Sequence, residues 1–491
     1  MIPRYENEEI KLLWTNEEKL KRWDSVELAV LEARAQRNEI DHGAAATIDH
    51  ILTDHPADIA WWLARDKEVG HDLNAYIDER RRHLRAELQY LFHQDMTSFD
   101  TEEAAFAIGL IESTTIVELH ARQLYDTLKS QAHRYRYLPM LDRTHGQWAK
   151  LCSFGGRLLT YVCELRFAYD GVEAAVQKCR YSRLSGAIGN YGAGLDPDLE
   201  AAALKLLGLE PFRGATQILP RSIYAPLAQA LLVLAKVVEK IAVDIRLGAR
   251  SGTPIVQEPF GKKQKGSSAM PHKKNTILTE QMTGMARLAE GYVHAIERSI
   301  ETWERRAIEQ SSVERVAWPD LFHVVLRMLT TMEKVCSGLT VYPDHMLREI
   351  VESRGTYASD EAKNFLAKEL SKHGIDAEVA YRILQLASFN AFEPKGVWKQ
   401  IRETVPESFE EAVAMYRHAK NQPRQPLESI QDIIPQGCLT RSDQLEAGPE
   451  IEDWNALLPR IFDEETRTRW DELFSIPYLL KNEERIFVEV L

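Results

Sequence analysis

Hydrophobic and polar positions are spaced along this chain mainly with the period of an α-helix. The clearest case runs from Ala225 to Gly248, where apolar residues recur at intervals of four and three and form one stripe: Leu227, Leu231, Leu234, Val238, Ile241 and Ile245. Such a stripe is a heptad seam that packs against neighbouring helices. The other faces add Leu232, Val233 and Val237, so we expect this helix to be buried on several sides. Its partners could belong to the same subunit or to another one.

Four other segments have long patterns of the same kind, at roughly 101–135, 148–178, 279–306 and 316–338. They are rich in Ala, Leu, Glu, Lys and Arg and contain few prolines, which favours long helices. No alternation of apolar and polar residues is long enough to predict a sheet. We therefore predict an all-α fold of three helical domains, with a central long-helix bundle, over residues 1–100, 101–345 and 346–491. A Pro- and Gln-rich stretch at 421–437 is typical of a connector.

Composition and charge exclude some classes of function but say less about the fold. The 491 residues exceed what one hydrophobic core usually supports, which fits several domains. The 61 basic and 74 acidic residues give a formal net charge of −13, whereas a general nucleic-acid binder needs a basic surplus. No run of 18 uncharged apolar residues predicts a membrane span, and the N-terminus has no targeting pattern. We therefore expect a cytoplasmic protein that binds neither nucleic acid nor membrane.

Cysteine usage gives no sign of a metal or disulfide framework. The five cysteines are scattered, and the chain contains no CxxC or HExxH motif. Neither a structural zinc site nor a set of disulfides is therefore predicted, and the thiols are expected to act as small apolar side chains.

The segment from Gly261 to Asn275, GKKQKGSSAMPHKKN, combines backbone freedom with dense positive charge. A nucleotide-triphosphate loop needs a lysine directly after its second glycine, but here Ser267 follows Gly266. A solvated basic loop would explain the lysines that precede Gly266. It would not explain the GSS-x-MP-x-K-x-N pattern that follows them.

That pattern closely resembles the signature of the fumarase/aspartase (argininosuccinate lyase-like) superfamily. The segments MTSFD at 96–100 and RTHGQ at 143–147 resemble two further blocks of this superfamily. Within it, the chain is most similar to the adenylosuccinate lyase family, on five short segments: RY at 4–5, HD at 71–72, SGAIGNY at 185–191, TQ at 216–217 and WERRAIEQSSVER at 303–315. The similarity extends from residue 1 to about 345 and is weak beyond it.

The resemblance implies an enzyme that removes fumarate from a succinyl group by β-elimination, acting on a small-molecule nucleotide without a metal or organic cofactor. A base must take the proton next to a carboxylate, and a general acid must protonate the departing nitrogen. Serine can be that base only where positive charge and backbone N–H groups stabilise its alkoxide. Ser267 has lysines around it and a predicted helix beginning near Thr279, so both are plausible here.

The resemblance also implies roles for individual residues. Ser267 is the expected base, and His145 is the expected general acid, with Glu280 raising the pKa of its imidazole. His71 is a second candidate near the leaving group, although a helix cap is its ordinary alternative. Lys273 is expected to stabilise the developing charge. His71, His145 and the Ser267 loop are expected to come from three different subunits of a homotetramer whose central helices form its core.

The expected substrate-binding residues fall into two groups. The phosphate and ribose side comprises Arg4, Tyr5, Arg306, Ser311 and Arg315, with a turn among the last three. Carboxylates and the base are expected to contact Asp72, Thr97, Ser98, Thr144, Gln217, Ser268, Met270 and Asn275. For the arginines the ordinary alternative is a solvated run of charge.

Four features depart from the pattern of the adenylosuccinate lyase family, and they bear on the substrate more than on the reaction type. One is the WAK at 148–150, which follows RTHGQ where a run of small residues and proline is common. Gly70 precedes His71 where Arg or Asn is usual, Ser222 stands in place of an acidic residue, and Thr276 in place of a proline. Argininosuccinate lyase, or another fumarate-releasing lyase, is the alternative within the superfamily. An inactive structural homologue is the alternative of a different class.

Overall fold

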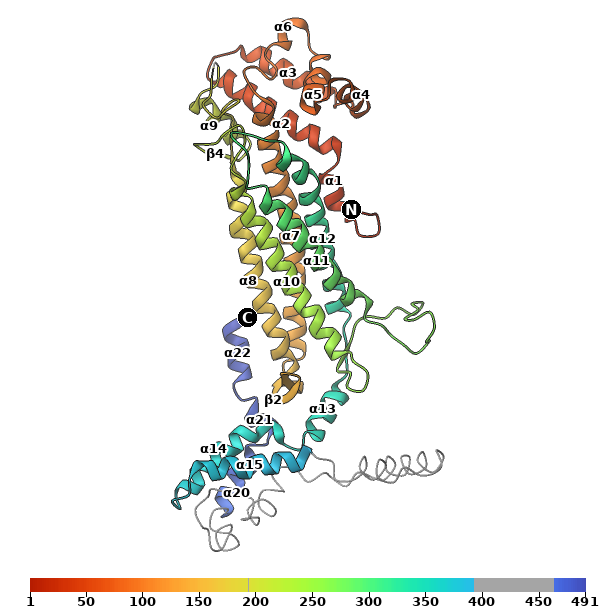
Figure 1. The fold of residues 1–491 in the computed structure, drawn as a ribbon, viewed down its shortest axis with the longest axis vertical. Coiled ribbons are helices and arrows are strands. Elements are labelled where there is room, and N and C mark those ends of the chain that lie inside the picture. The colour runs from red at the N-terminus through yellow and green to blue at the C-terminus, as the bar shows by residue number, and fades with distance from the viewer. Residues whose placement is uncertain (193, 393–462) are drawn as a thin grey trace. The chain divides into compact units, whose positions relative to one another are not determined.

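The computed structural model describes residues 1–192, 194–392 and 463–491, and it is built mainly of helices (Figure 1). The predicted all-α class is confirmed. The chain divides into two compact units: unit 1 comprises residues 1–128, 161–249 and 257–339, and unit 2 comprises residues 129–160, 250–256 and the described part of 340–491. The division into three domains stays a prediction.

Unit 1 contains most of the long helices. Its elements, two of which extend into unit 2, are α1 (Glu8–Leu13), α2 (Asn16–Gln36), α3 (His42–Asp54), α4 (Ile59–Val69), α5 (Asp72–Arg81), α6 (Ala86–Gln89), α7 (Ser98–Arg134), α8 (Phe154–Val176), η1 (Gln177–Arg180), β3 (Tyr181–Ser182), α9 (Pro197–Leu206), β4 (Glu210–Pro211), η2 (Arg221–Ile223), α10 (Ala225–Gly248), α11 (Ile277–Arg298) and α12 (Glu309–Ser337).

Unit 2 consists of short helices and strand pairs. Its elements are β1 (Pro139–Thr144), β2 (Gln147–Ser153), β5 (Val256–Gln257, which ends in unit 1), β6 (Thr340–Val341), α13 (Pro343–Glu352), η3 (Thr356–Ala358), α14 (Ser359–Ser371), α15 (Ala377–Phe392), α20 (Glu464–Glu472), α21 (Ile476–Leu479) and α22 (Glu483–Val490).

Helices α7, α8, α10, α11 and α12 run side by side as the bundle of unit 1 (Figure 1). Helix α10 has the predicted bounds, and every residue of its heptad stripe is at most 6% exposed. The other apolar faces are less covered than expected, because Val233 is 48% exposed and Leu247 is 47% exposed. Three alanines beside the stripe, Ala228, Ala235 and Ala242, are buried as well, so within one chain burial covers one broad face of the helix rather than several sides.

The other predicted long helices differ from the structure mainly at their ends. Helix α7 begins at Ser98, three residues before its predicted start, and α12 begins at Glu309 rather than near Val316. Helix α11 ends at Arg298, so the prediction that it continues to 306 is wrong. Residues 299–308 form a connection instead, which supplies the turn that was expected between Arg306 and Ser311.

A β-hairpin occupies residues that the sequence pattern assigned to the start of a helix. Strands β1 and β2 pair antiparallel, with Thr144 opposite Gln147, so His145 and Gly146 form a two-residue turn. Both have positive φ angles, 54° and 77°, as a type I′ turn requires. The register shifts between Leu141 and Arg143, and such a bulge interrupts the alternation by which strands are recognised. The expectation of no sheet is wrong here.

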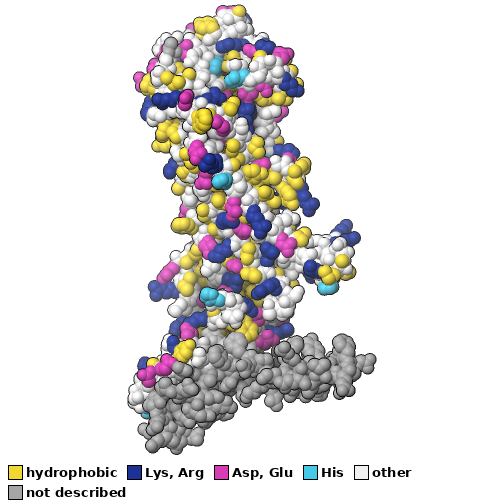
Figure 2. Space-filling view, in the orientation of Figure 1, with side chains coloured by type: hydrophobic (Ala, Val, Ile, Leu, Met, Phe, Trp, Pro, Cys, Tyr) yellow, Lys and Arg dark blue, Asp and Glu magenta, His cyan; other side chains and the backbone are white. Residues whose placement is uncertain are grey.

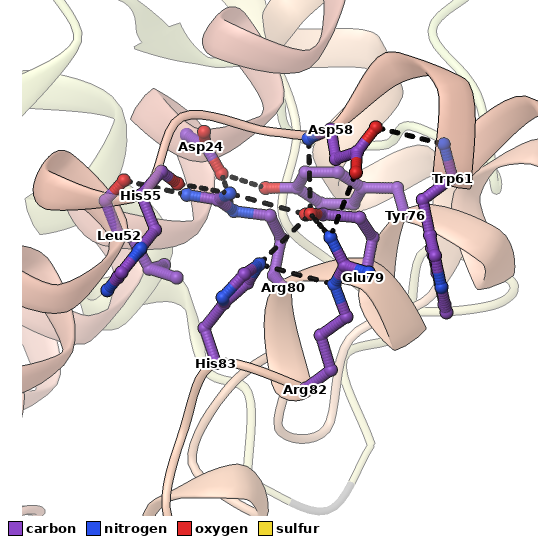
Figure 3. A network of polar contacts seen from close by, with 10 residues as sticks. All are labelled: Asp24, Leu52, His55, Asp58, Trp61, Tyr76, Glu79, Arg80, Arg82 and His83. Carbon is purple, nitrogen blue, oxygen red and sulfur yellow. Dashed lines mark hydrogen bonds and ion pairs between the residues drawn. The ribbon is translucent and has the colours of Figure 1, made fainter.

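A buried polar network joins the end of α3, the start of α4 and the end of α5 (Figure 3). The fully buried Arg80 pairs with Asp24 at 2.9 Å and donates to the carbonyl oxygens of Leu52 and His55, each at 2.8 Å. Glu79, also fully buried, accepts a hydrogen bond from the N-cap residue of α4 at 3.1 Å. Because an unpaired buried charge costs several kcal/mol, these contacts fix α5, whose first turn carries predicted site residues.

Among the described residues, helix α7 is long and apolar enough to cross a membrane by length and composition alone. Half of its most apolar window is buried inside the protein. Its residues Leu110, Val117, Leu124 and Leu128 are at most 1% exposed, as expected of a core helix in a bundle.

Unit 2 has a small core of its own, in which α14 and α15 pack against α20. Trp470 of α20 is 1% exposed and lies 5.8 Å from the ring of Phe365. The Ser153 hydroxyl at the end of β2 donates to the Glu483 carboxylate of α22 at 2.6 Å. The Pro- and Gln-rich stretch at 421–437 lies outside the described residues.

Candidate active site

The Ser267 loop lies between β5 and α11 and projects from the bundle of unit 1 (Figure 1). Figure 2 shows basic side chains gathered on this projection. The Ser267 hydroxyl oxygen accepts hydrogen bonds from the backbone N–H groups of Ala269 at 3.3 Å and Met270 at 3.1 Å. Such donors favour a negatively charged oxygen over a neutral hydroxyl. The geometry therefore supplies the N–H groups that a serine base needs.

The loop is closed on itself just behind the serine. The Asn275 side-chain amide donates to the Gly266 carbonyl oxygen at 2.7 Å. A Cβ atom at Gly266 would lie only 1.9 Å from the Lys273 carbonyl oxygen, so the backbone can approach this closely only with glycine. These contacts hold Asn275 against Gly266, the residue that precedes Ser267.

The base of the loop is fixed to the N-terminus of α11. Glu258, which is fully buried, accepts hydrogen bonds from the backbone N–H groups of Leu278 and Thr279 and from the Thr279 hydroxyl, each at 3.1 Å. These N–H groups have no partner within the helix, and a carboxylate there also interacts favourably with the helix dipole. Glu258 thus anchors the start of α11 independently of the exposed tip of the loop.

The remaining predicted residues of this loop are accessible. Ser268, Met270 and Lys273 are exposed, and Met270 is 44% exposed. Glu280 is exposed in the first turn of α11. The structure therefore places these side chains where they can reach a ligand without first leaving a packed core.

A second group of predicted residues gathers around the first turn of α7. The Arg306 guanidinium lies over the ring of Phe99, 4.2 Å from its centroid, and donates to the Gln217 side-chain oxygen at 2.5 Å. The Thr97 backbone N–H donates to the Asp100 carboxylate at 2.8 Å, which caps the helix where Ser98 begins it. Four predicted binding residues thus lie at or against one helix start.

The third group lines a cavity of about 360 Å³ in unit 1. Asp72, Ser311 and Arg315 are among its lining residues. The Arg315 guanidinium contacts the Asp72 carboxylate at 2.9 Å and the Glu102 carboxylate at 3.5 Å. The Lys19 ammonium contacts the same oxygen of Asp72 at 2.9 Å. The structure therefore brings Ser311 and Arg315, two of the residues expected on the phosphate and ribose side, to one charged cavity.

Burial sets the protonation of the carboxylates in this cavity. It raises the pKa of Glu102 to about 7, and the charge of Asp72 adds to the rise against the opposing effects of Arg315, Lys19 and Arg306. Burial acts in the same direction on the pKa of Asp72, but Lys19 and Arg315 outweigh it and lower that pKa below its ordinary value. Asp72 is thus the permanent anion of the pair, while Glu102 titrates near neutral pH.

His71 caps helix α5, so its ring has the helix-cap role that was the alternative to a role in catalysis. The His71 Nδ1 atom accepts a long hydrogen bond from the Asn74 backbone N–H at 3.4 Å. Gly70, which precedes it, ends α4 in the left-handed conformation with φ of +66°, where glycine is favoured. The departure at Gly70 therefore has a local structural reason. The cap leaves the other ring nitrogen available for chemistry.

In the hairpin of unit 2, Thr144 ends strand β1 and His145 follows it in the turn, and both residues are exposed. The other predicted site residues belong to unit 1. Among these, Arg4 and Tyr5 lie in the N-terminal turn, where the Tyr5 backbone N–H donates to Ile2 at 2.9 Å. Neither is among the residues that line the cavity.

Several residues at these sites were missed by sequence reasoning. Lys19, Phe99, Glu102 and Glu258 contact predicted residues or anchor their elements. Phe99 stands inside the MTSFD block, and Glu102 follows it by three positions, so the helical period was an available signal for Glu102. Nothing in the local sequence connects Glu258 to a helix that begins about 20 residues later.

Comparison with known proteins identifies the family. A family model described as lyase matches residues 7–291. The adenylosuccinate lyase of Synechocystis sp. is 36% identical over 399 residues, which is 81% of this chain and 90% of that protein. The adenylosuccinate lyase of Thermotoga maritima is 34% identical over 385 residues, covering 78% of this chain and 87% of that protein.

Solved structures agree on the fold. The 3-carboxy-cis,cis-muconate lactonizing enzyme from Pseudomonas putida superposes with a TM-score of 0.75 at 17% identity, covering 99% of this chain and 96% of that one. The fumarate lyase from Mesorhizobium sp. BNC1 gives a TM-score of 0.72 at 19% identity, covering 96% and 99%. The family match and the identity to full-length relatives confirm the predicted resemblance: the chain belongs to the lyase family and, within it, to the adenylosuccinate lyases.

Proposed function

We propose that this protein is an adenylosuccinate lyase, a C–N lyase that eliminates fumarate from adenylosuccinate to give AMP. The same β-elimination would act on the succinylaminoimidazole carboxamide ribotide of purine biosynthesis. The observation that carries the proposal is the Ser267 hydroxyl, which accepts two backbone N–H hydrogen bonds inside a basic loop, in a chain that is 36% identical to the Synechocystis adenylosuccinate lyase.

Ser267 is proposed as the base that removes the proton next to the substrate carboxylate. The N–H groups of Ala269 and Met270 stabilise its alkoxide, and the surrounding lysines add positive charge. Loss of the proton places a second negative charge on the carboxylate, and Lys273, Ser268 and Asn275 are positioned along the same loop to bind it. Because the loop tip is exposed, it must close over the substrate to keep water from the carbanion-like intermediate.

His145 is proposed as the general acid for the departing nitrogen, with Glu280 raising the pKa of its imidazole and His71 near the leaving group. An exposed side chain at the tip of a two-residue turn suits a group that enters the site of another subunit. We propose a homotetramer on the same basis. Val233 and Leu247 of α10 are about half exposed in one chain, and packing of α10 against another subunit would bury them.

The nucleotide is proposed to bind through the cavity and the start of α7. Arg315, Ser311 and Arg306, together with Arg4 and Tyr5, would bind the phosphate and ribose. Arginine suits this role because its planar fork of donors matches phosphate oxygens. Asp72, Thr97, Ser98, Thr144, Gln217 and Met270 complete the proposed contacts to the carboxylates, ribose and base. No metal or organic cofactor has a role, because the substrate's own carboxylate activates the proton.

The experiment that tests this function is an ultraviolet assay of the purified protein with adenylosuccinate, following its loss and the appearance of AMP and fumarate. Argininosuccinate serves as the competing substrate. Turnover of argininosuccinate but not of adenylosuccinate would assign the chain to the alternative lyase. Binding of adenylosuccinate without turnover would indicate an inactive homologue, which the retained Ser267 geometry disfavours. The proposed location of the enzyme is the cytoplasm.

A further inference from the structure

Arg315, the proposed phosphate-binding residue, is already paired with two carboxylates. Its Nη2 atom lies 2.9 Å from Asp72 and 3.5 Å from Glu102. The Glu102 side chain is 12% exposed and that of Asp72 is 14% exposed, whereas the Arg315 side chain is 52% exposed, so the two carboxylates are largely buried and the guanidinium is open to a ligand from solvent. A phosphate must therefore compete with both carboxylates for the same guanidinium.

The charges around the cavity make this competition severe. Its charged lining residues are Lys19, Arg22, Arg221 and Arg315 on the basic side and Asp66, Asp72, Glu102, Glu103 and Glu314 on the acidic side. Arg221 is neutralised by Glu103 at 2.8 Å and Glu314 at 2.7 Å. The cavity does not carry the excess of positive charge that a dianion would prefer.

We propose that Glu102 is a positioning residue for the nucleotide phosphate, one that holds Arg315 in the free enzyme and releases it by taking up a proton when the phosphate binds. This inference rests on the proposed function, because it takes a nucleoside monophosphate as the ligand. Protonation removes one of the two carboxylates that compete for Arg315. It also lowers the repulsion between the cavity and the incoming dianion.

The groups that face Glu102 come from four elements, which makes proton uptake the expected response. Asp72 of α5 repels its charge, while Lys19 of α2, Arg315 of α12 and Arg306 before α12 attract it. With the pKa of Glu102 raised to about 7, roughly half of this carboxyl group is already protonated at neutral pH. A phosphate next to Arg315 adds negative charge and withdraws the attraction of that arginine. Both effects raise the pKa of Glu102 further.

Calorimetry tests directly whether Glu102 takes up a proton when the phosphate binds. AMP is titrated into the full-length protein at pH 7.5 in two buffers with different ionisation enthalpies, which gives the protons taken up on binding. Adenosine, which lacks the phosphate, is titrated in parallel, and its binding is expected to show no uptake by Glu102. The wild type is expected to take up about half a proton more with AMP than Glu102→Gln does. Because the AMP–adenosine comparison needs only the wild-type protein, it remains valid if the variant folds poorly.

The affinity for AMP gives a second readout. At pH 8.5 Glu102→Gln is expected to bind AMP up to about tenfold more tightly than the wild type, with a smaller difference at pH 6, since one pKa unit corresponds to a factor of ten. The matched control is Glu118→Gln, which changes a second, partly buried carboxylate of α7 that lies outside the cavity and should behave as wild type. Equal proton uptake by the wild type and Glu102→Gln would overturn the inference. Failure of the wild type to bind AMP at all would instead reject the proposed function.

Discussion

Asn275 closes the Ser267 loop onto Gly266: its side-chain amide donates to the Gly266 carbonyl oxygen at 2.7 Å. This contact fixes both ends of the segment that contains Ser267. It leaves the tip, with its lysines, exposed to solvent. The loop is therefore tied at its base, beside the serine, and accessible at its tip.

Gly266 should be essential for activity but not for the fold. Gly266→Ala places a Cβ atom 1.9 Å from the Lys273 carbonyl oxygen, so the loop must open and Ser267 must move. We expect kcat to fall by about a hundredfold, since a displacement of about 1 Å in a catalytic group has this effect. The matched control is Gly284→Ala within α11, where the added Cβ meets nothing within 4 Å. That change should leave kcat intact and stabilise the helix by about 0.5–1 kcal/mol. Equal activity of the two variants would contradict the loop geometry.

Arg315 should discriminate a nucleotide lyase from another fumarate-releasing lyase. Arg315→Met removes the proposed phosphate contact but keeps most of the side-chain volume. A charge-assisted hydrogen bond contributes about 1.5–3 kcal/mol, so KM for adenylosuccinate should rise about ten- to a hundredfold. Steady-state kinetics measure this rise, with Arg298→Met as the control, because Arg298 is exposed and pairs with Glu301 on the surface. An unchanged KM would remove Arg315 from the phosphate site.

Glu258 should contribute to stability by capping α11. Glu258→Ala leaves the backbone N–H groups of Leu278 and Thr279 without their acceptor, while the Thr279 hydroxyl keeps the Thr276 carbonyl oxygen as its acceptor. We expect a loss of about 2–3 kcal/mol in the free energy of unfolding, as for other buried donors deprived of a partner. Urea denaturation followed by circular dichroism measures it. A loss below about 0.5 kcal/mol would show that water or a neighbouring residue replaces the carboxylate.

Asp24 should make stability depend on pH. Burial raises the pKa of Asp24 to about 6, although Arg80 and Tyr76 act to lower it. Because the folded pKa is above that of the unfolded chain, the contribution of Asp24 is fully present below about pH 4 and is lost as the pH rises through 6. Two pKa units correspond to about 2–3 kcal/mol. Asp24→Asn should therefore gain stability relative to the wild type between pH 4 and 6.5, measured by urea denaturation at both pH values. If the difference in unfolding free energy between Asp24→Asn and the wild type is the same at pH 4 and pH 6.5, the raised pKa of Asp24 is contradicted.

The sequence predicted best where structure depends on local periodicity. The heptad stripe of α10 located that helix to the residue, because a buried stripe leaves its spacing in the sequence. The resemblance of the loop segment to a family signature singled out Ser267 and Asn275, and the structure joins their neighbourhood through the hydrogen bond from Asn275 to the Gly266 carbonyl oxygen.

The sequence predicted the structure least well where contacts join distant parts of the chain. The Lys19–Asp72 and Arg315–Glu102 contacts span 53 and 213 positions, and no local pattern records them. The hairpin of His145 was missed because a bulge breaks its alternation. The end of α11 was missed because residues up to 306 keep a helical composition, whereas the chain turns after Arg298.

The most direct test of the account is the activity of Ser267→Ala. If Ser267 is the base, kcat for adenylosuccinate should fall by about a thousandfold or more, while calorimetry should still detect substrate binding within about threefold of the wild type. Ser312→Ala, which changes an exposed serine at the start of α12, should retain wild-type turnover. A Ser267→Ala enzyme that keeps more than about a tenth of the wild-type kcat would contradict the assignment of Ser267 as the base.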